Sequence, residues 1–325
     1  MEWAFKRDFR SQQGTDRCPF SSAIHCHSLC HSIVENINYQ LMMKPWIFAA
    51  AIVFTFPIWS AAGESNFTAH QELIERIGAT NEKVELYWTA PSNAQANKKY
   101  PAIIYIHGVQ DDSHPGAINM VNGGLLQMTS DLGYFAVATS MPGYGHSSGK
   151  RDFCGRDSQV ALQSVVRYLR TRPDVDPKNI AVSGISCGAI ASAMIADKES
   201  LAAMILISGV YEFKDMYLKW HTPEWKLEPS VIKYIDEVVA QDGGIDTAST
   251  YRSALKNTKK IKLPILVIAG AKDTIVDHNQ SATFAKAIEK DGYSNKFVLN
   301  AGGGHMISYE DWSKYATDFL KKHLQ

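Results

Sequence analysis

The sequence predicts an α/β fold in which helices cover both faces of a mostly parallel, twisted sheet. From residue 64 onward, short apolar runs rich in β-branched residues alternate with longer stretches of helical periodicity. This alternation is typical of strands that are joined by helical crossovers. The composition agrees with a globular chain, because 45% of the 325 residues are hydrophobic and 20% are charged.

Apolar runs bounded by turn residues are expected to be strands. They lie at residues 83–88, 102–106, 134–139, 180–183, 203–208, 264–269 and 296–299. Segments with helical periodicity or a helical composition are expected to be helices. They lie at residues 118–131, 157–171, 187–196, 281–291 and 309–323. Residues 211–260 interrupt the alternation with an aromatic-rich insertion. We expect it to form a small helical cap over the carboxyl edge of the sheet, where open α/β sheets bind ligands.

The balance of basic and acidic residues indicates which kinds of molecule the chain binds. Lys plus Arg and Asp plus Glu both number 33, so the formal net charge is zero. A neutral chain has no global basic field that would attract nucleic acid. We therefore expect a small-molecule ester or a short peptide as the partner, and no nucleic acid.

The first 62 residues differ from the rest. Residues 1–41 hold three cysteines and three histidines near residues 18–31 without periodicity, and a metal cluster there is disfavoured because no second ligand pair follows. From Met42, a lysine precedes the uncharged run 46–62, which closes on Ser60-Ala61-Ala62. This is the pattern of a signal peptide. We expect residues 1–41 to be an over-extended start, 42–62 to be a signal peptide and 63–325 to be the exported domain. The alternative is a membrane anchor at 46–62.

The pentapeptide Gly184-Ile185-Ser186-Cys187-Gly188 carries the clearest chemical signal. It has the form G-x-S-x-G and lies between an expected strand and an expected helix. A tight strand-to-helix turn exposes its serine as a nucleophile and needs small neighbours, while the helix N-terminus favours negative charge. Ser186 is the candidate nucleophile.

A candidate acid and a candidate base follow further along the chain. Asp273 comes directly after the expected strand 264–269, and it is preferred over Asp277, which lies four residues further into the loop. His305 follows three glycines after the expected strand 296–299. The order Ser, Asp, His matches the order of α/β-hydrolases and differs from the chymotrypsin and subtilisin orders.

The expected strand 102–106 ends in His107-Gly108-Val109. Acyl transfer needs two N–H donors where the carbonyl oxygen becomes an oxyanion. The backbone N–H groups of Val109 and Cys187 are the expected pair. Because these donors are backbone groups, Gly108 is the one residue in the sequence that indicates them.

These residues, together with the loop 141–149 and the segment 174–188, make residues 83–325 resemble an α/β-hydrolase. Within that fold the chain is most similar to the prolyl oligopeptidase and dienelactone hydrolase group. The resemblance implies a Ser-His-Asp triad that acts through an acyl-enzyme. We expect no cofactor and no metal, because residues 63–325 contain no phosphate-binding loop motif and no paired metal-ligand motif. The chain has no room for the β-propeller of the oligopeptidases, so peptidase specificity does not follow. Residues expected to contact the substrate are His107, Gly108, Tyr144, Trp220 and Trp225.

The sequence leaves several alternatives open. The main interpretation is an exported serine hydrolase that cleaves small esters. The alternatives are a serine peptidase acting on short peptides, a ligand-binding relative without turnover, and a membrane-tethered scaffold. Cys154 and Cys187, the cysteines of the expected exported domain, either form a disulfide or remain as two buried thiols.

Overall fold

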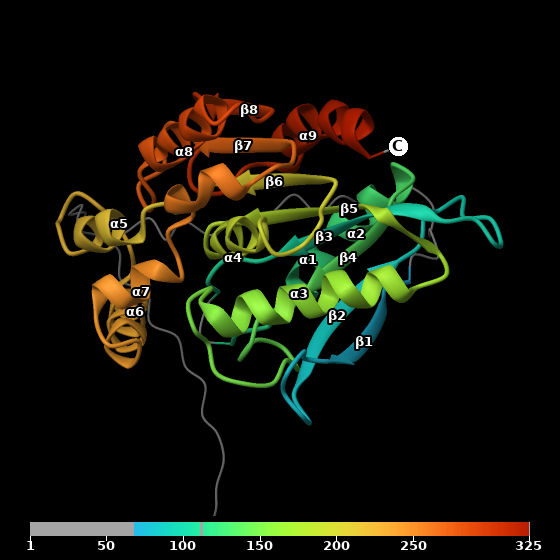
Figure 1. Cartoon of the computed structure of the whole chain (residues 1–325), viewed down its shortest axis with the longest axis horizontal. Helices are drawn as coiled ribbons and strands as arrows, with labels where there is room; N and C mark the ends of the chain where they lie inside the picture. The colour runs from blue at the N-terminus through green and yellow to red at the C-terminus, as the bar shows by residue number, and fades with distance from the viewer. Residues whose placement is uncertain (1–67, 111–112, 325) are drawn as a thin grey trace, which may run out of the picture. The chain divides into compact units, whose positions relative to one another are not determined.

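A computed structural model of the chain describes residues 68–110 and 113–324 (Figure 1). In this part of the chain, an eight-stranded sheet has the order β1-β2-β4-β3-β5-β6-β7-β8. Its strands are β1 (His70–Glu75), β2 (Lys83–Thr89), β3 (Tyr100–Ile106), β4 (Phe135–Thr139), β5 (Val175–Ile185), β6 (Ala203–Ile207), β7 (Ile265–Gly270) and β8 (Asn295–Asn300). The first two strands pair antiparallel, and β3 to β8 run parallel. The predicted α/β class and mostly parallel sheet are confirmed.

Helices cover both faces of the sheet, as predicted. One face packs against α3 (Arg156–Thr171), α4 (Cys187–Ile195) and α8 (His278–Lys290). The other face packs against α2 (Leu125–Asp131) and α9 (Tyr309–His323), with the short α1 (Ile118–Asn122) beside them. Side chains of β3 alternate between the two cores, because successive residues of a strand point to opposite faces.

The expected strands correspond to β2 through β8, with ends that differ by a few residues. The strand β1 was not predicted. Its sequence, HQELIE, is polar because most of its side chains are exposed at the edge of the sheet. The expected helix at 118–131 is in fact two helices, because Gly124 has a φ of 77°, a left-handed conformation that ends the first helix and begins the second.

The insertion is helical. It contains α5 (Phe213–Trp220), α6 (Pro229–Gln241), α7 (Ile245–Thr250) and the 3-10 helix η1 (Ala254–Lys260). In Figure 1 helices α5 to α7 lie on the side of the sheet where the parallel strands end. We call residues 211–260 the cap.

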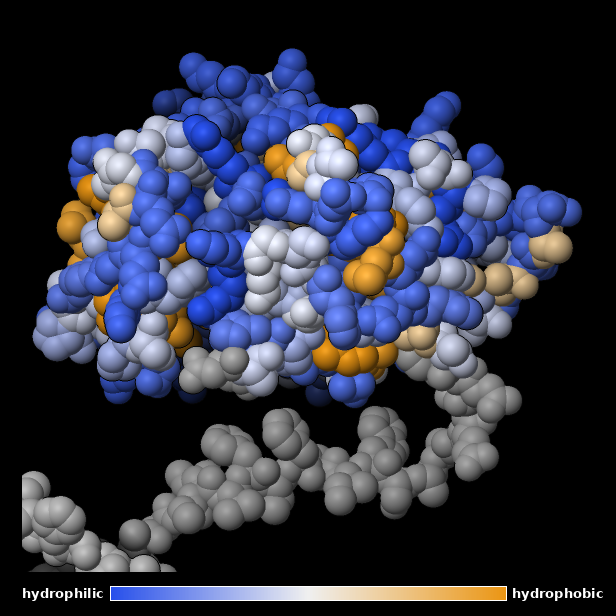
Figure 2. Space-filling model, turned by 90° about the horizontal axis from the view of Figure 1, so that it is seen from below, coloured by the Kyte–Doolittle hydropathy of each residue, from blue (hydrophilic) through white to orange (hydrophobic). Residues whose placement is uncertain are grey.

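The predicted segments 1–41 and 42–62, with the alternative anchor at 46–62, lie outside the described residues. Among the residues that are described, no helix is both long and apolar enough to cross a membrane. Hydrophilic side chains cover most of the face shown in Figure 2, and apolar ones lie there in separate small patches.

Candidate active site

Ser186 occupies the turn between β5 and α4, with a φ of 55° and a ψ of −121°. Its N–H donates to the carbonyl of Ile207 at 2.8 Å, which fixes the turn to the neighbouring strand. The turn needs both flanking glycines. A Cβ on Gly188 would lie 2.4 Å from the carbonyl oxygen of Ile106, and one on Gly184 would lie 2.3 Å from that of Gly188. The G-x-S-x-G spacing is thus dictated by backbone crowding around the serine.

Asp273 and His305 form a hydrogen-bonded pair. The Nδ1 of His305 lies 2.8 Å from Oδ2 of Asp273, whose side chain is 1% exposed. The other carboxylate oxygen accepts from the N–H groups of Ile275 and Val276 at 2.8 and 2.9 Å. These backbone donors hold the carboxylate in one orientation, so the imidazole ring is oriented as well.

Asp277 has a different role. Its side chain accepts from the N–H of Asn279 and so caps α8, and it pairs with Lys219 of the cap at 2.8 Å. The structure therefore places Asp273, and not Asp277, against the histidine.

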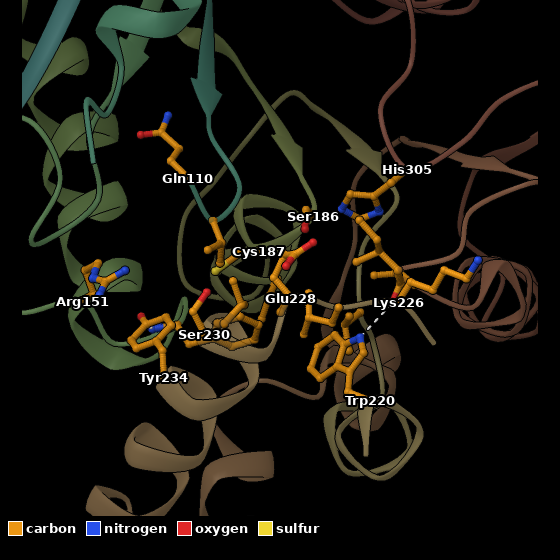
Figure 3. A pocket seen from close by; sticks show the side chains of 18 residues that line it. Gln110, Arg151, Ser186, Cys187, Trp220, Lys226, Glu228, Ser230, Tyr234 and His305 are labelled. Carbon is orange, nitrogen blue, oxygen red and sulfur yellow. Dashed lines mark hydrogen bonds between the residues drawn. The ribbon is translucent and has the colours of Figure 1, made fainter. Parts of the chain in front are cut away.

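Ser186 and His305 open onto the same cavity, which has a volume of about 490 Å³ (Figure 3). In Figure 3 the serine hydroxyl and the imidazole ring lie beside each other at the wall of the cavity. The lining comes from the strand ends and from the cap. It consists of Val109, Gln110, Arg151, Phe153, Ser186, Cys187, Ile190, Val210, Trp220, Lys226, Leu227, Glu228, Ser230, Val231, Tyr234, Ile275, Val276 and His305.

The expected oxyanion donors, Val109 and Cys187, both line this cavity. Gly108 lies against Ser186, since a Cβ on residue 108 would be 3.0 Å from Cβ of Ser186. The backbone around Gly108 is oriented by His107. The ring nitrogen Nε2 of His107 accepts from the N–H of Met141 at 3.1 Å, so Nδ1 carries the proton and donates to the carbonyl of Gly108 at 2.7 Å.

The contact of His107 has a consequence for the next peptide. In a trans peptide the carbonyl of residue 108 and the N–H of residue 109 point in opposite directions. By holding the carbonyl of Gly108, His107 fixes the direction of the Val109 N–H. Burial lowers the pKa of His107 to about 4, so the ring is neutral near pH 7 and keeps this tautomer.

Four of the five residues expected to contact the substrate are not part of the cavity lining. Gly108 lies behind the lining, against Ser186. His107 is 2% exposed and acts through the backbone. Tyr144 is 3% exposed and packs edge-on against His107, with 4.6 Å between the ring centroids. Trp225 packs against the core. Only Trp220 lines the cavity as expected. The sequence predicts these residues from their position in a loop or in the aromatic-rich insertion, and position does not tell which way a side chain points.

Sequence reasoning missed the polar lining, above all Gln110, Arg151, Lys226 and Glu228. Gln110 and Arg151 follow β3 and β4 in the loops at the carboxyl edge, and this position is a signal that could have identified them. Lys226 and Glu228 belong to the cap, whose path over the sheet has no sequence signature. The cavity is therefore lined by polar side chains as well as by the cap aromatics Trp220 and Tyr234.

Cys154 and Cys187 form a disulfide, with 5.6 Å between their Cα atoms. Of the two alternatives left open by the sequence, the bridge is the one found. It joins the loop between β4 and α3 to the residue that follows Ser186. Among the described residues, no group of three His, Cys, Asp or Glu side chains is arranged to hold a metal ion.

Comparison with known proteins adds a family and a fold. The model of the prolyl oligopeptidase family matches residues 125–325. An uncharacterized peptidase of Bacillus subtilis (strain 168), YuxL, is 23% identical over 240 residues, which are 67% of this chain and 33% of that protein. The chain thus spans about a third of the length of this relative.

Solved structures at 18 to 19% identity share the α/β-hydrolase fold. An acylaminoacyl peptidase of Pyrococcus horikoshii matches with a TM-score of 0.62 over 79% of this chain and 42% of its own. An esterase of Pyrococcus furiosus, Pf2001, matches with a TM-score of 0.58 over 80% of this chain and 94% of its own. The butyrate-bound esterase Est2 of Thermogutta terrifontis matches with a TM-score of 0.59 over 78% of this chain and 94% of its own.

Proposed function

The chain belongs to the prolyl oligopeptidase family, and we propose that it is a serine hydrolase with the catalytic triad Ser186, His305 and Asp273. One observation carries the proposal. A serine on a strained strand-to-helix turn and a histidine held by a buried carboxylate open onto one cavity. Nucleophile, base and orienting acid are the three parts that acyl transfer by serine requires.

The geometry supports a two-step reaction. His305 takes the proton of the Ser186 hydroxyl through Nε2 while the oxygen attacks the substrate carbonyl, and Asp273 stabilises the imidazolium. The N–H groups of Val109 and Cys187 bind the oxyanion of the tetrahedral intermediate. The histidine then gives its proton to the leaving group. Water attacks the acyl-enzyme in the second step and regenerates the serine.

We propose esters with short acyl groups as the substrates. A cavity of about 490 Å³ is in the range of ordinary small-molecule sites, and the structurally similar esterase Est2 was solved with bound butyrate. Cleavage of short peptides is the second candidate. It is favoured by the family match and by the peptidases among the similar proteins.

Two measurements test the proposal together. The Ser186→Ala variant should lose covalent labelling by a fluorophosphonate and all ester hydrolysis, while its circular dichroism stays unchanged, because only an activated serine attacks this probe. Labelling of the alanine variant would refute the assignment of Ser186.

The substrate class is tested with nitrophenyl esters of increasing acyl length. Activity should peak at about two to six carbons and fall at least about tenfold at twelve, because each added methylene beyond a fitted pocket changes discrimination by roughly 1 to 3 kcal/mol. Aminoacyl nitroanilides cleaved faster than acetate esters would favour the peptidase instead.

We also propose that the protein is exported and that a signal peptide at residues 42–62 is removed. The disulfide Cys154–Cys187 supports this, since such bridges persist in oxidising compartments.

A further inference from the structure

We propose that the Cys154–Cys187 disulfide is a positioning element that holds residues 152–154 as a fixed wall of the substrate cavity. This inference rests on the proposed function and adds a determinant of substrate specificity. The bridge is buried, because its two cysteines are 1% and 2% exposed. It connects a loop that forms part of the cavity to the residue next to the nucleophile.

The loop has a conformation that needs external support. Phe153 and Cys154 have φ values of 45° and 57°, two consecutive side-chain-bearing residues in the left-handed region. Such conformations are disfavoured for L-residues and persist where surrounding contacts over-determine them. The segment therefore keeps its shape only through its ties to the rest of the molecule.

Several hydrogen bonds hold the segment besides the disulfide, including one from Nε2 of Gln159 to the carbonyl of Cys154 at 3.3 Å. The fully buried Arg252 donates to the carbonyls of Asp152 and Phe153 at 2.7 and 2.9 Å. The hydroxyl of Tyr234 accepts from the N–H of Phe153 at 2.7 Å. The carboxylate of Asp152 accepts from the N–H groups at the start of α3. Arg252 and Tyr234 belong to the cap, so the loop joins the cap to the sheet.

The two ends of the disulfide are not equally constrained without it. The start of α4 is fixed by the hydrogen bond from Ser186 to β6 and by the close packing of Gly188 on β3, and all nine residues of α4 are buried. The loop of Cys154 has no regular secondary structure. The disulfide therefore anchors the loop of Cys154 to the rigid turn at Ser186. Its loss should increase the mobility of the loop more than that of the turn.

The loop carries a side chain of the cavity wall. Phe153 lines the cavity, and its ring packs against those of Trp220 and Tyr234, with 5.9 and 6.1 Å between centroids. Figure 3 shows Arg151 and Tyr234 on the side of the cavity away from His305. A substrate that is long enough to reach Phe153 should depend on the disulfide, and an acetate ester should not.

The experiment compares wild type with Cys154→Ala, whose altered side chain is not part of the cavity lining. Two esters are used, 4-nitrophenyl acetate and 4-nitrophenyl 4-phenylbutanoate. For the phenylbutanoate, KM should rise about tenfold in the variant, the size of effect that one misfitted apolar contact produces. For the acetate, kcat/KM should change by less than about threefold, because the oxyanion donors stay in place.

Reduction of the wild-type protein provides the same break without a substitution. Dithiothreitol gives two electrons and two protons to the bridge, the S–S bond becomes two thiols, and the reagent closes to its cyclic disulfide. KM for the phenylbutanoate should rise as in the variant and should recover on reoxidation. Cys154→Ala with the same reagent is the control, and it should show no further change.

Hydrogen exchange gives a readout that does not depend on catalysis. The amides of residues 151–156 should exchange faster in the variant and in the reduced protein, with little change in α4. An unchanged KM for the phenylbutanoate, or an equal loss of kcat on both esters with no faster exchange, would overturn the proposal. If wild type hydrolyses neither ester, the proposed function fails, and exchange still decides whether the disulfide orders the loop.

Discussion

Two aspartates in the same loop, Asp273 and Asp277, show how single side chains divide the work at the site. The carboxylate of Asp273 is held by two backbone N–H groups and faces His305. That of Asp277 caps α8 and pairs with Lys219. Asp273 orients His305, the proposed base, and Asp277 caps α8 and pairs with the cap.

Substitution of each aspartate by asparagine separates these roles. Asp273→Asn should reduce kcat/KM about 10⁴-fold, because the amide stabilises the wrong imidazole tautomer. Asp277→Asn keeps a side-chain acceptor for the helix cap and should reduce kcat/KM less than about tenfold. Steady-state kinetics on one ester measures both, and the reverse ranking would assign the orienting role to Asp277.

The buried His107 should make the stability of the fold depend on pH. Its pKa is lowered by burial from 6.5 to about 4, so between these values the unfolded chain binds a proton that the folded chain does not. Stability therefore falls as pH drops from about 6.5 to 4, by about 3 kcal/mol from this group.

Urea unfolding from pH 7 to pH 4 checks the contribution of His107. His107→Gln should flatten the decline in unfolding free energy by about that 3 kcal/mol, although it lowers the value at pH 7. The same substitution at the exposed His70 is the control and should leave the slope as in wild type. An equally steep decline in His107→Gln would show that the group is not responsible.

Among the elements, the position of Ser186, the proposed nucleophile, depends on how closely β3, β5 and α4 approach one another. Gly188 allows this contact, since a Cβ there would lie 2.4 and 2.6 Å from the carbonyl oxygens of Ile106 and His107. These oxygens belong to the backbone of β3 and its following loop, so relief requires that α4 move.

Gly188→Ala should lower the unfolding free energy by about 1 to 3 kcal/mol, as overpacking does. It should also reduce turnover about 10²-fold, because a displacement of about 1 Å at the reacting group has that effect. Gly302→Ala is the matched control in the loop before His305, where the nearest atom would be 4.0 Å from the new Cβ. Thermal unfolding and steady-state kinetics should be measured on both variants. Equal losses of stability and turnover in Gly188→Ala and Gly302→Ala would contradict the role of Gly188.

The sequence predicts the elements where local patterns are strong. The buried parallel strands were predicted because each is a nearly continuous apolar run between turn residues. Strand β1 was missed because it pairs on one side only and is polar. The division between α1 and α2 was missed because Gly123-Gly124 lies in an otherwise continuous helical pattern.

The same distinction applies to the site at the scale of the whole molecule. Ser186, Asp273 and His305 each follow a strand, and parallel strands bring their carboxyl ends to one edge, so pattern and topology together predict their meeting. The cavity wall depends on how the cap folds back onto the sheet. Arg252, for example, reaches residues 152 and 153 across about a hundred positions of sequence, and no local pattern marks this contact.

We predict that the chain is exported and cleaved after its N-terminal apolar run. A lysine, an apolar run at 46–62 and Ser60-Ala61-Ala62 satisfy the requirements of a signal peptide. Disulfides form and persist in oxidising compartments. The exported protein should therefore begin near Gly63, and under denaturing, non-reducing conditions it should contain no titratable thiol, since Cys154 and Cys187 are its two cysteines.

N-terminal sequencing and thiol titration of the exported protein test this. A version beginning at Gly63 and made in a reducing cytosol is the control, and it should show two thiols per chain that disappear on oxidation. A protein that keeps residues 1–62 and fractionates with membranes would identify 46–62 as an anchor. In that case the bridge would form on a tethered domain, and the thiol count alone would not distinguish the two forms, so the N-terminal sequence decides between them.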